Sequence, residues 1–118
     1  MIRKKAEQRV ELKENQYGGQ GQITITHGIE KQDHNNPRFH MFARVTVPAG
    51  ATIGRHNHTG KTEAVCILEG VCLYKDNSGE EHTLLPGDCA IVSGTEDEQQ
   101  MRNPGPDAMV YMVAIVTD

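Results

Sequence analysis

Apolar and polar residues alternate in short runs along most of the chain, and turn-forming residues separate these runs. The run Gln22-Ile23-Thr24-Ile25-Thr26 is a clear example, because every second residue is apolar and most side chains are β-branched. We expect strands over residues 22–26, 39–47, 63–68, 71–74, 89–92, 99–102 and 108–116, with strand residues on both sides of a turn at 76–79. Eight or nine short strands at this spacing predict an all-β domain, either a sandwich or a small barrel.

The first 21 residues follow a different pattern. Their charges alternate in a way that a helix tolerates, and they end in the glycine-rich run Tyr17-Gly18-Gly19-Gln20-Gly21, which is typical of a loop. This segment could form a short helix, an irregular arm or an edge strand. At 118 residues the chain is long enough for one domain with a core. We therefore expect a single domain over 1–118, with an N-terminal arm (1–21) and a barrel (22–118).

Composition narrows the classes of function. The chain is 36% hydrophobic and lacks tryptophan, which suits a narrow β core better than a helical bundle. A net charge of −4 without a basic cluster argues against nucleic-acid binding. No apolar run reaches the length of a membrane span, and residues 1–5 lack the apolar stretch of a signal peptide, so we expect a cytoplasmic protein. Cys66, Cys72 and Cys89 have no C-x-x-C spacing and are expected to be free thiols packed as small hydrophobes.

Two histidines and a glutamate provide the most informative chemistry in the chain. His56 and His58 are two residues apart, so on a strand both would point to one face with Cα atoms roughly 6.6 Å apart. Thr59-Gly60-Lys61 reads as a turn that returns Glu63 to the same face. Two imidazoles and one carboxylate form the ligand set of a mononuclear metal site with open positions. The other histidines lie in polar loops or at strand edges, where we expect surface positions.

The wider frame around these residues, Gly50-x5-His56-x-His58-x4-Glu63-x6-Gly70, resembles the first motif of the cupin family at every specified position. The segment from Gly87-Asp88 to Asn103-Pro104-Gly105 resembles the second cupin motif less closely. The family has a histidine four residues before the asparagine, and this chain has Gln99 there; with a shorter loop, Glu98 would take that position instead.

This resemblance covers roughly residues 39–117 and implies a double-stranded β-helix, or jelly-roll, barrel. It also implies one divalent metal ion in the mouth of the barrel, and homodimerisation through an N-terminal strand that is exchanged between subunits. The ligands carried over from the family are His56, His58, Glu63 and Gln99. The donor set does not choose between Fe, Mn, Ni and Zn.

A divalent ion with one carboxylate ligand keeps a net positive charge, which attracts a small anionic or bidentate oxygen compound. We expect a metal-dependent enzyme of oxygenase, isomerase or lyase type, in which Glu63 is a ligand or acts as the catalytic base. The alternatives are a non-catalytic cupin that binds or senses a sugar or small acid, and a structural barrel without metal.

Two further residues are candidates for substrate binding. Arg44 lies in the middle of a predicted strand, where it would face solvent, pair with an acid, or reach into the barrel mouth as a clamp for a carboxylate. Met101 follows Gln99 by two residues and would share its face, so it either lines the pocket or belongs to the core.

Overall fold

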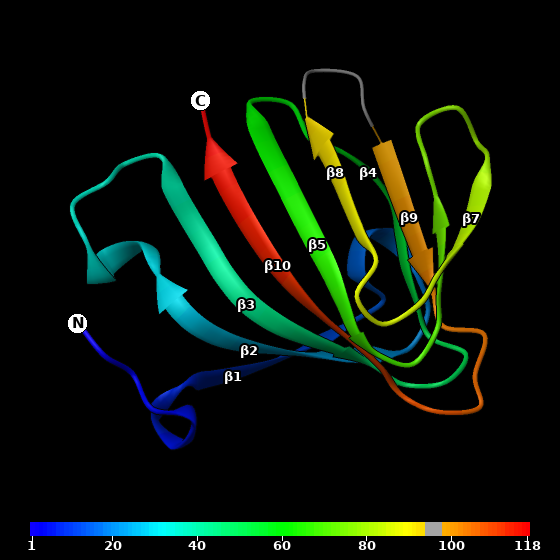
Figure 1. Ribbon diagram of the computed structural model, residues 1–118, viewed down its shortest axis with the longest axis horizontal. Coiled ribbons are helices and arrows are strands. Elements are labelled where there is room, and N and C mark those ends of the chain that lie inside the picture. The colour runs from blue at the N-terminus through cyan, green and yellow to red at the C-terminus, as the bar shows by residue number, and fades with distance from the viewer. Residues whose placement is uncertain (94–97) are drawn as a thin grey trace.

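Two antiparallel sheets form the molecule, and they lie against each other along most of their length (Figure 1). The computed structural model describes residues 1–93 and 98–118. The larger sheet has the strand order β1-β2-β3-β10-β5-β8, and the smaller has the order β4-β9-β6-β7. The described strands are β1 (Arg9–Glu14), β2 (Gln22–Glu30), β3 (Phe39–Val47), β4 (Thr52–Asn57), β5 (Lys61–Glu69), β6 (Cys72–Lys75), β7 (Glu81–Leu84), β8 (Cys89–Ser93), β9 (Glu98–Arg102) and β10 (Met109–Thr117). The described residues also form three single-turn 3₁₀ helices: η1 (Lys5–Glu7), which precedes β1, η2 (Gln16–Gly18) and η3 (Lys31–Asp33).

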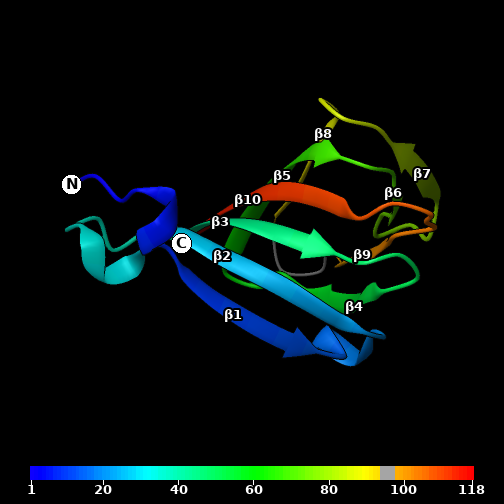
Figure 2. The same cartoon turned by 90° about the horizontal axis from the view of Figure 1, so that it is seen from below.

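The N-terminal segment is an edge strand, one of the three forms that the sequence left open. Strand β1 pairs antiparallel with β2 of the same chain, from Arg9 opposite His27 to Glu14 opposite Gln22 (Figure 2). Arg3 ties the preceding residues to η3, because its guanidinium donates to both carboxylate oxygens of Asp33 at 2.6 and 2.8 Å. Exchange of this strand between subunits, which the resemblance implied, stays a prediction.

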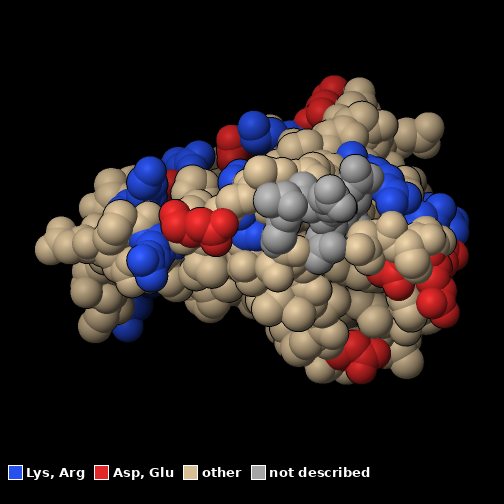
Figure 3. Space-filling model, turned by 90° about the horizontal axis from the view of Figure 1, so that it is seen from above, with Lys and Arg blue, Asp and Glu red and all other residues tan. Residues whose placement is uncertain are grey.

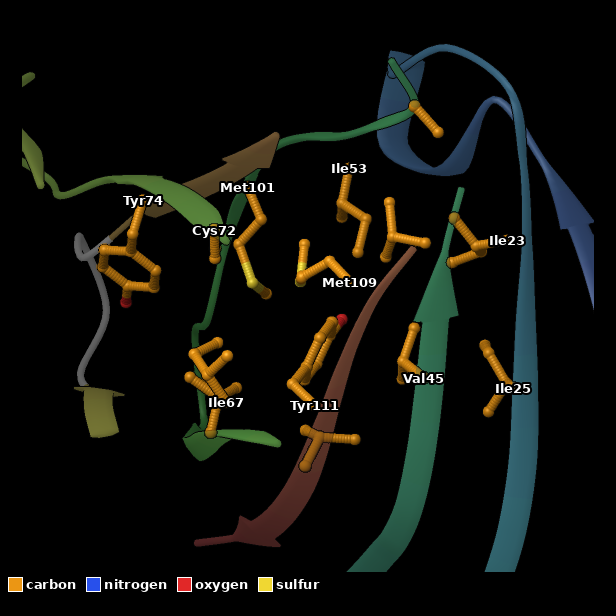
Figure 4. Close-up of a cluster of buried hydrophobic side chains, with 14 of the residues drawn as sticks. Ile23, Ile25, Val45, Ile53, Ile67, Cys72, Tyr74, Met101, Met109 and Tyr111 are labelled. Carbon is orange, nitrogen blue, oxygen red and sulfur yellow. The ribbon is translucent and has the colours of Figure 1, made fainter. Parts of the chain in front are cut away.

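The core lies between the two sheets. The strands β2, β3 and β5 of the larger sheet bury alternate residues, as in β3, where Ala43, Val45 and Val47 are at most 3% exposed. Figure 4 shows side chains of both sheets pointing toward one another, with Ile25 and Val45 on one side and Ile53 and Met101 on the other. A fully buried aliphatic side chain of this kind contributes about 1.5–3 kcal/mol. This packing holds the ends of β4, β5 and β9 together, and the candidate site lies there.

Charged side chains of both signs are interspersed on the face drawn in Figure 3, and neither sign forms a continuous surface there. Among the described residues, no helix is long and apolar enough to span a membrane.

Candidate metal centre

The two histidines and the glutamate come together where β4 turns into β5. His56 belongs to β4, His58 follows the end of that strand, and Glu63 lies on β5. The backbone N–H of Lys61 donates to the carbonyl of His58 at 2.9 Å and closes the turn. Gly60 has a φ of 73° in this turn, a conformation that glycine adopts without strain. The turn therefore brings Glu63 back to the histidines.

A β-bulge aims His56 at the site. In the pairing of β4 with β9, Ile53 lies opposite Met101 but His56 lies opposite Gln99, so β4 has one extra residue between these two pairs. Strict alternation would place residues three apart on opposite faces. Because the bulge shifts the alternation by one residue, Ile53 and His56 both line the same pocket.

The donor atoms are close enough to share one ion. The Nε2 atom of His58 lies 2.5 Å from Oε2 of Glu63, and Nε2 of His56 lies 3.8 Å from the same oxygen. The three candidate ligand atoms all lie within 4.8 Å of one another. His58 is 3% exposed and Glu63 is 8% exposed. A buried carboxylate with two imidazoles is a suitable donor set for a divalent transition metal ion.

His56 is oriented by two neighbours outside the donor set. Its Nδ1 lies 3.0 Å from the carbonyl oxygen of Gly54. This contact leaves Nε2 directed at Glu63, and a metal ion bound there would select the tautomer in which Nδ1–H donates to the Gly54 carbonyl. The ring of Tyr17 stacks on the imidazole with a centroid distance of 3.9 Å and an interplanar angle of 13°.

Gln99 completes the group from β9. Its Nε2 donates to Oε2 of Glu63 at 2.6 Å, while its Oε1 is buried without a hydrogen-bond partner. An orphaned buried acceptor is costly, and a half-turn of the amide would direct this oxygen toward the same point as the other donors. The residues therefore fit an ion with His56, His58, Glu63 and Gln99 as ligands. The alternative ligand, Glu98, stands in β9, but its side chain lies outside the described part of the structure.

The site holds Glu63 in its ionised form. Burial alone raises the pKa of Glu63, but hydrogen bonds and charge interactions with His56 and His58 outweigh burial and leave the pKa below its ordinary value. Tyr111 is affected in the opposite sense, because burial and then the charge of Glu63 raise its pKa well above the ordinary value. At neutral pH the site thus combines a carboxylate with a protonated phenol.

The donors open into a cavity of about 100 Å³ between the sheets. Met101 lines this cavity and is 1% exposed. It therefore both lines the pocket and belongs to the core, the two roles that the sequence left open for it. Tyr17 and Gln16 from η2, Lys61 from β5 and Tyr111 from β10 also line it. Tyr111 shares the inward face of β10 with Met109 and Val113, a relation that strand alternation could have revealed. The sequence offers no comparable signal for Tyr17.

Arg44 is absent from the described residues that line the cavity. Its neighbours Ala43 and Val45 are buried in the core, so the alternation of β3 places Arg44 on the outer face of the larger sheet. Of the three positions that the sequence left open for Arg44, the structure agrees with the outer face and not with a clamp in the barrel mouth, since Arg44 lies opposite Thr26 and Met112 on the neighbouring strands.

Comparison with known proteins agrees with this geometry. The Cupin domain family matches residues 43–116. The chain belongs to the cupin family. An oxalate-binding protein of Thermotoga maritima is 30% identical to this cupin over 103 residues, which make up 86% of this chain and 82% of the relative. The jelly-roll fold expected from the sequence is confirmed by the two antiparallel sheets and by the structural neighbours that follow.

Two solved structures illustrate the range of similar folds. The crystal structure of a predicted oxalate decarboxylase from Thermotoga maritima matches this cupin with a TM-score of 0.91 and 26% identity, and the match covers 100% of both chains. The polyketide cyclase RemF of Streptomyces resistomycificus matches with a TM-score of 0.72 and 15% identity over 99% of this chain and 80% of the other. At that identity the second likeness shows the fold alone.

Proposed function

We propose that this cupin binds one divalent metal ion through His56, His58, Glu63 and Gln99 and uses the centre to bind a small dicarboxylate, with oxalate as the first candidate. The observation that carries the proposal is the convergence of the two imidazoles and the carboxylate within 4.8 Å at a buried cavity. The 30% identical relative that is named for oxalate binding supports the choice of ligand.

Charge favours an anionic ligand. A divalent ion has one carboxylate ligand in this donor set, so the centre keeps about one positive charge and acts as a Lewis acid toward carboxylate oxygens. Lys61 also lines the cavity and adds a second positive group. Fe, Mn, Ni and Zn all tolerate such ligands, and the donor set does not select among them.

Size favours a ligand of few atoms. The cavity of about 100 Å³ is smaller than ordinary ligand pockets, which range over about 300–1,000 Å³. Ile53, Met101 and Val113 form apolar walls around the polar donors. A compact dicarboxylate that presents two oxygens to one ion suits this space, whereas a sugar or a long-chain acid would exceed it.

Calorimetric titration tests this proposal. Protein loaded with Mn²⁺ or Zn²⁺ is titrated with oxalate, with acetate as a single carboxylate and with succinate as a longer diacid. We expect oxalate to bind most tightly, and to bind only after metal loading. Equal oxalate binding by chelator-treated protein, or no oxalate binding by loaded protein, would contradict the proposal.

Catalysis on the same ligand is the second candidate, as an oxygenase or a lyase; an isomerase would need a different small oxygen-rich substrate. It is favoured by the presence of a carboxylate, Glu63, and a phenol, Tyr111, in the lining of one cavity, because these groups can accept and donate a proton. Incubation of the loaded protein with ¹³C-labelled oxalate, followed by NMR and by oxygen consumption, distinguishes the two candidates. Loss of oxalate conversion in Tyr111→Phe, with oxalate binding retained, supports catalysis. Oxalate binding without conversion in the wild type supports a non-catalytic binding protein.

A further inference from the structure

Two of the three cysteines face each other across neighbouring strands, away from the metal centre. Cys66 on β5 lies directly opposite Cys89 on β8. Glu63, Val65 and Ile67 are buried on the inner face of β5, so Cys66 projects from the outer face of the sheet. Cys89 is exposed and Cys66 is half-buried, whereas Cys72 is buried in the core. The expectation of thiols packed as small hydrophobes thus describes Cys72 but not Cys89.

The hydrogen-bond pattern identifies the type of this pair. The N–H of Ile67 donates to the carbonyl of Asp88 at 3.0 Å, one position along the same ladder. Hydrogen-bonded and non-hydrogen-bonded pairs alternate in an antiparallel ladder, so Cys66 and Cys89 form a non-hydrogen-bonded pair. The Cα atoms of such a pair are about 4.5 Å apart, at the short end of the range of about 4.4–6.8 Å that a disulfide spans. Both side chains project from the same face of the sheet, as a disulfide between neighbouring strands requires.

The two thiols already interact. A hydrogen bond with Cys66 raises the pKa of the Cys89 thiol, and burial adds a smaller effect in the same direction. Each thiol also has a weak backbone acceptor, with Cys66 3.8 Å from the carbonyl of Ile67 and Cys89 3.7 Å from that of Gly87. Both cysteines line a shallow groove of about 370 Å³ on the outer face, beside Phe42, Ile91 and Met112. A small oxidant can reach the pair from this groove.

We propose that Cys66 and Cys89 form a dithiol site that small disulfides oxidise reversibly to an intramolecular disulfide. In the first step the exposed Cys89, as thiolate, attacks one sulfur of a low-molecular-weight disulfide such as glutathione disulfide. A mixed disulfide forms and one glutathione thiolate leaves. Cys66, as thiolate, then attacks the Sγ atom of Cys89, and the second glutathione thiolate leaves. The protein loses two electrons and two protons, and the two released thiolates take up the protons as two molecules of reduced glutathione.

The site is independent of the proposed metal centre, because Cys66 and Glu63 project from opposite faces of β5.

Cys72 provides a matched control. It is buried in the core, whereas Cys89 is exposed, so Cys72 stays shielded from the oxidant.

The test treats the full chain with glutathione disulfide and reads the product by intact mass, by alkylation and by peptide mapping. We expect a loss of two hydrogen atoms and a peptide that links Cys66 to Cys89. Alkylation after unfolding should then modify one of the three cysteines, Cys72, and dithiothreitol should restore all three. Cys72→Ser should form the same bridge, whereas Cys66→Ser and Cys89→Ser should stop at a glutathione adduct or remain unmodified.

Three outcomes would overturn the proposal. They are a wild type that keeps three free thiols, a bridge that links two chains on a non-reducing gel, and a bridge that includes Cys72. The wild-type peptide map decides among these outcomes even where a variant fails to fold.

Discussion

His56 is held on three sides, by Gly54 and Tyr17 outside the donor set and by the second histidine of that set, His58. The Gly54 carbonyl fixes its Nδ1 at 3.0 Å, the ring of Tyr17 covers one face, and the ring of His58 lies at a centroid distance of 4.4 Å. Tyr17 has a φ of 53°, a left-handed conformation that costs a non-glycine residue about 1–2 kcal/mol. This backbone strain at Tyr17, whose ring stacks on the candidate ligand His56, indicates a functional constraint on the position of the tyrosine ring.

Removal of the Tyr17 ring should weaken metal binding. An aromatic stack of this kind is worth about 0.5–1.5 kcal/mol, so Tyr17→Ala should raise the metal Kd by about 2- to 10-fold. Tyr17→Phe keeps the stack and should stay near the wild-type value. Competition with a chromophoric chelator measures both constants. Equal losses in the two variants would mean that the hydroxyl, and not the stacked ring, is the important group.

Single residues were predictable where a motif constrained them. The spacing of His56, His58 and Glu63 was sufficient to bring these three together, and the resemblance added Gln99. The reason given for the histidines was incomplete, because His58 lies beyond the end of β4 and His56 faces the cavity through a bulge. A bulge depends on pairing with β9 and cannot be read from local alternation. Arg44 was left ambiguous because a charged residue in a strand carries no sign of which sheet face is buried.

At the scale of elements, η2 and the following loop are seated against β4. Thr52 holds this loop twice, because its N–H donates to the carbonyl of Gln20 at 2.8 Å and its Oγ1 accepts from the N–H of Gln20 at 2.7 Å. Gly54 permits the close approach, since a Cβ atom there would lie 1.9 Å from the carbonyl oxygen of Tyr17. The glycine is therefore required by the backbone of another element.

Gly54→Ala should displace η2 and destabilise the fold. Overpacking of this type costs about 1–3 kcal/mol, and it should also weaken metal binding, because both Tyr17 and the Gly54 carbonyl contact His56. Gly28→Ala is the control, since its Cβ would come no closer than 3.2 Å to another residue. Urea unfolding compares the two. An unchanged midpoint for Gly54→Ala would show that η2 is not fixed in this position.

The turn between β6 and β7 is stabilised by Asp76, which accepts from the N–H groups of Ser78 and Glu80 and lies 2.8 Å from Nε2 of His82. Hydrogen bonds with Ser78 and then with His82 lower the pKa of Asp76, and the bond to Asp76 raises the pKa of His82. The contribution of His82 is complete below its unfolded pKa of about 6.5 and is lost as the pH rises through the raised folded value. The contribution of Asp76 is present above its unfolded pKa of about 3.9 and is lost as the pH falls through the lowered folded value.

The pair should therefore stabilise the turn most between about pH 4 and pH 6.5. An NMR titration should give His82 a pKa above its ordinary value, and Asp76→Asn should return that pKa toward it. The signal of His40, which has no contact with this turn among the interactions described, serves as the internal reference. A His82 titration that is the same in wild type and Asp76→Asn would contradict the pairing.

The bounds of several strands were predicted closely. The strand expected over 39–47 matches β3, the one over 89–92 ends one residue before β8 does, and the one over 108–116 is shifted by one residue at each end relative to β10. The N-terminal segment was ambiguous because the alternation from Arg9 to Lys13 includes only two apolar residues, Val10 and Leu12, and both are exposed, so pairing with β2 and not burial holds this edge strand. The contact of η2 with β4 could not be predicted, since it joins segments more than thirty residues apart through backbone atoms.

At the scale of the whole molecule, the order of strands within the two sheets places the site. Strand β10 pairs with both β3 and β5, so the C-terminal strand lies in the middle of the larger sheet. Strand count and turn spacing predicted an all-β domain but did not distinguish a sandwich from a barrel. The motif resemblance supplied the jelly-roll, because non-local strand order leaves no trace in local alternation.

The central claim is that His56, His58 and Glu63 form one metal centre with Gln99. The most direct test is metal analysis of protein purified without chelator or affinity metal, beside the double variant His56→Ala with His58→Ala. The account predicts about one equivalent of a divalent transition metal per wild-type chain and none in the folded double variant, because two of the four ligands are removed. Circular dichroism checks that the variant keeps its β structure. Equal metal content in both proteins, or none in wild type even after incubation with Mn²⁺, Fe²⁺, Ni²⁺ and Zn²⁺, would contradict the account.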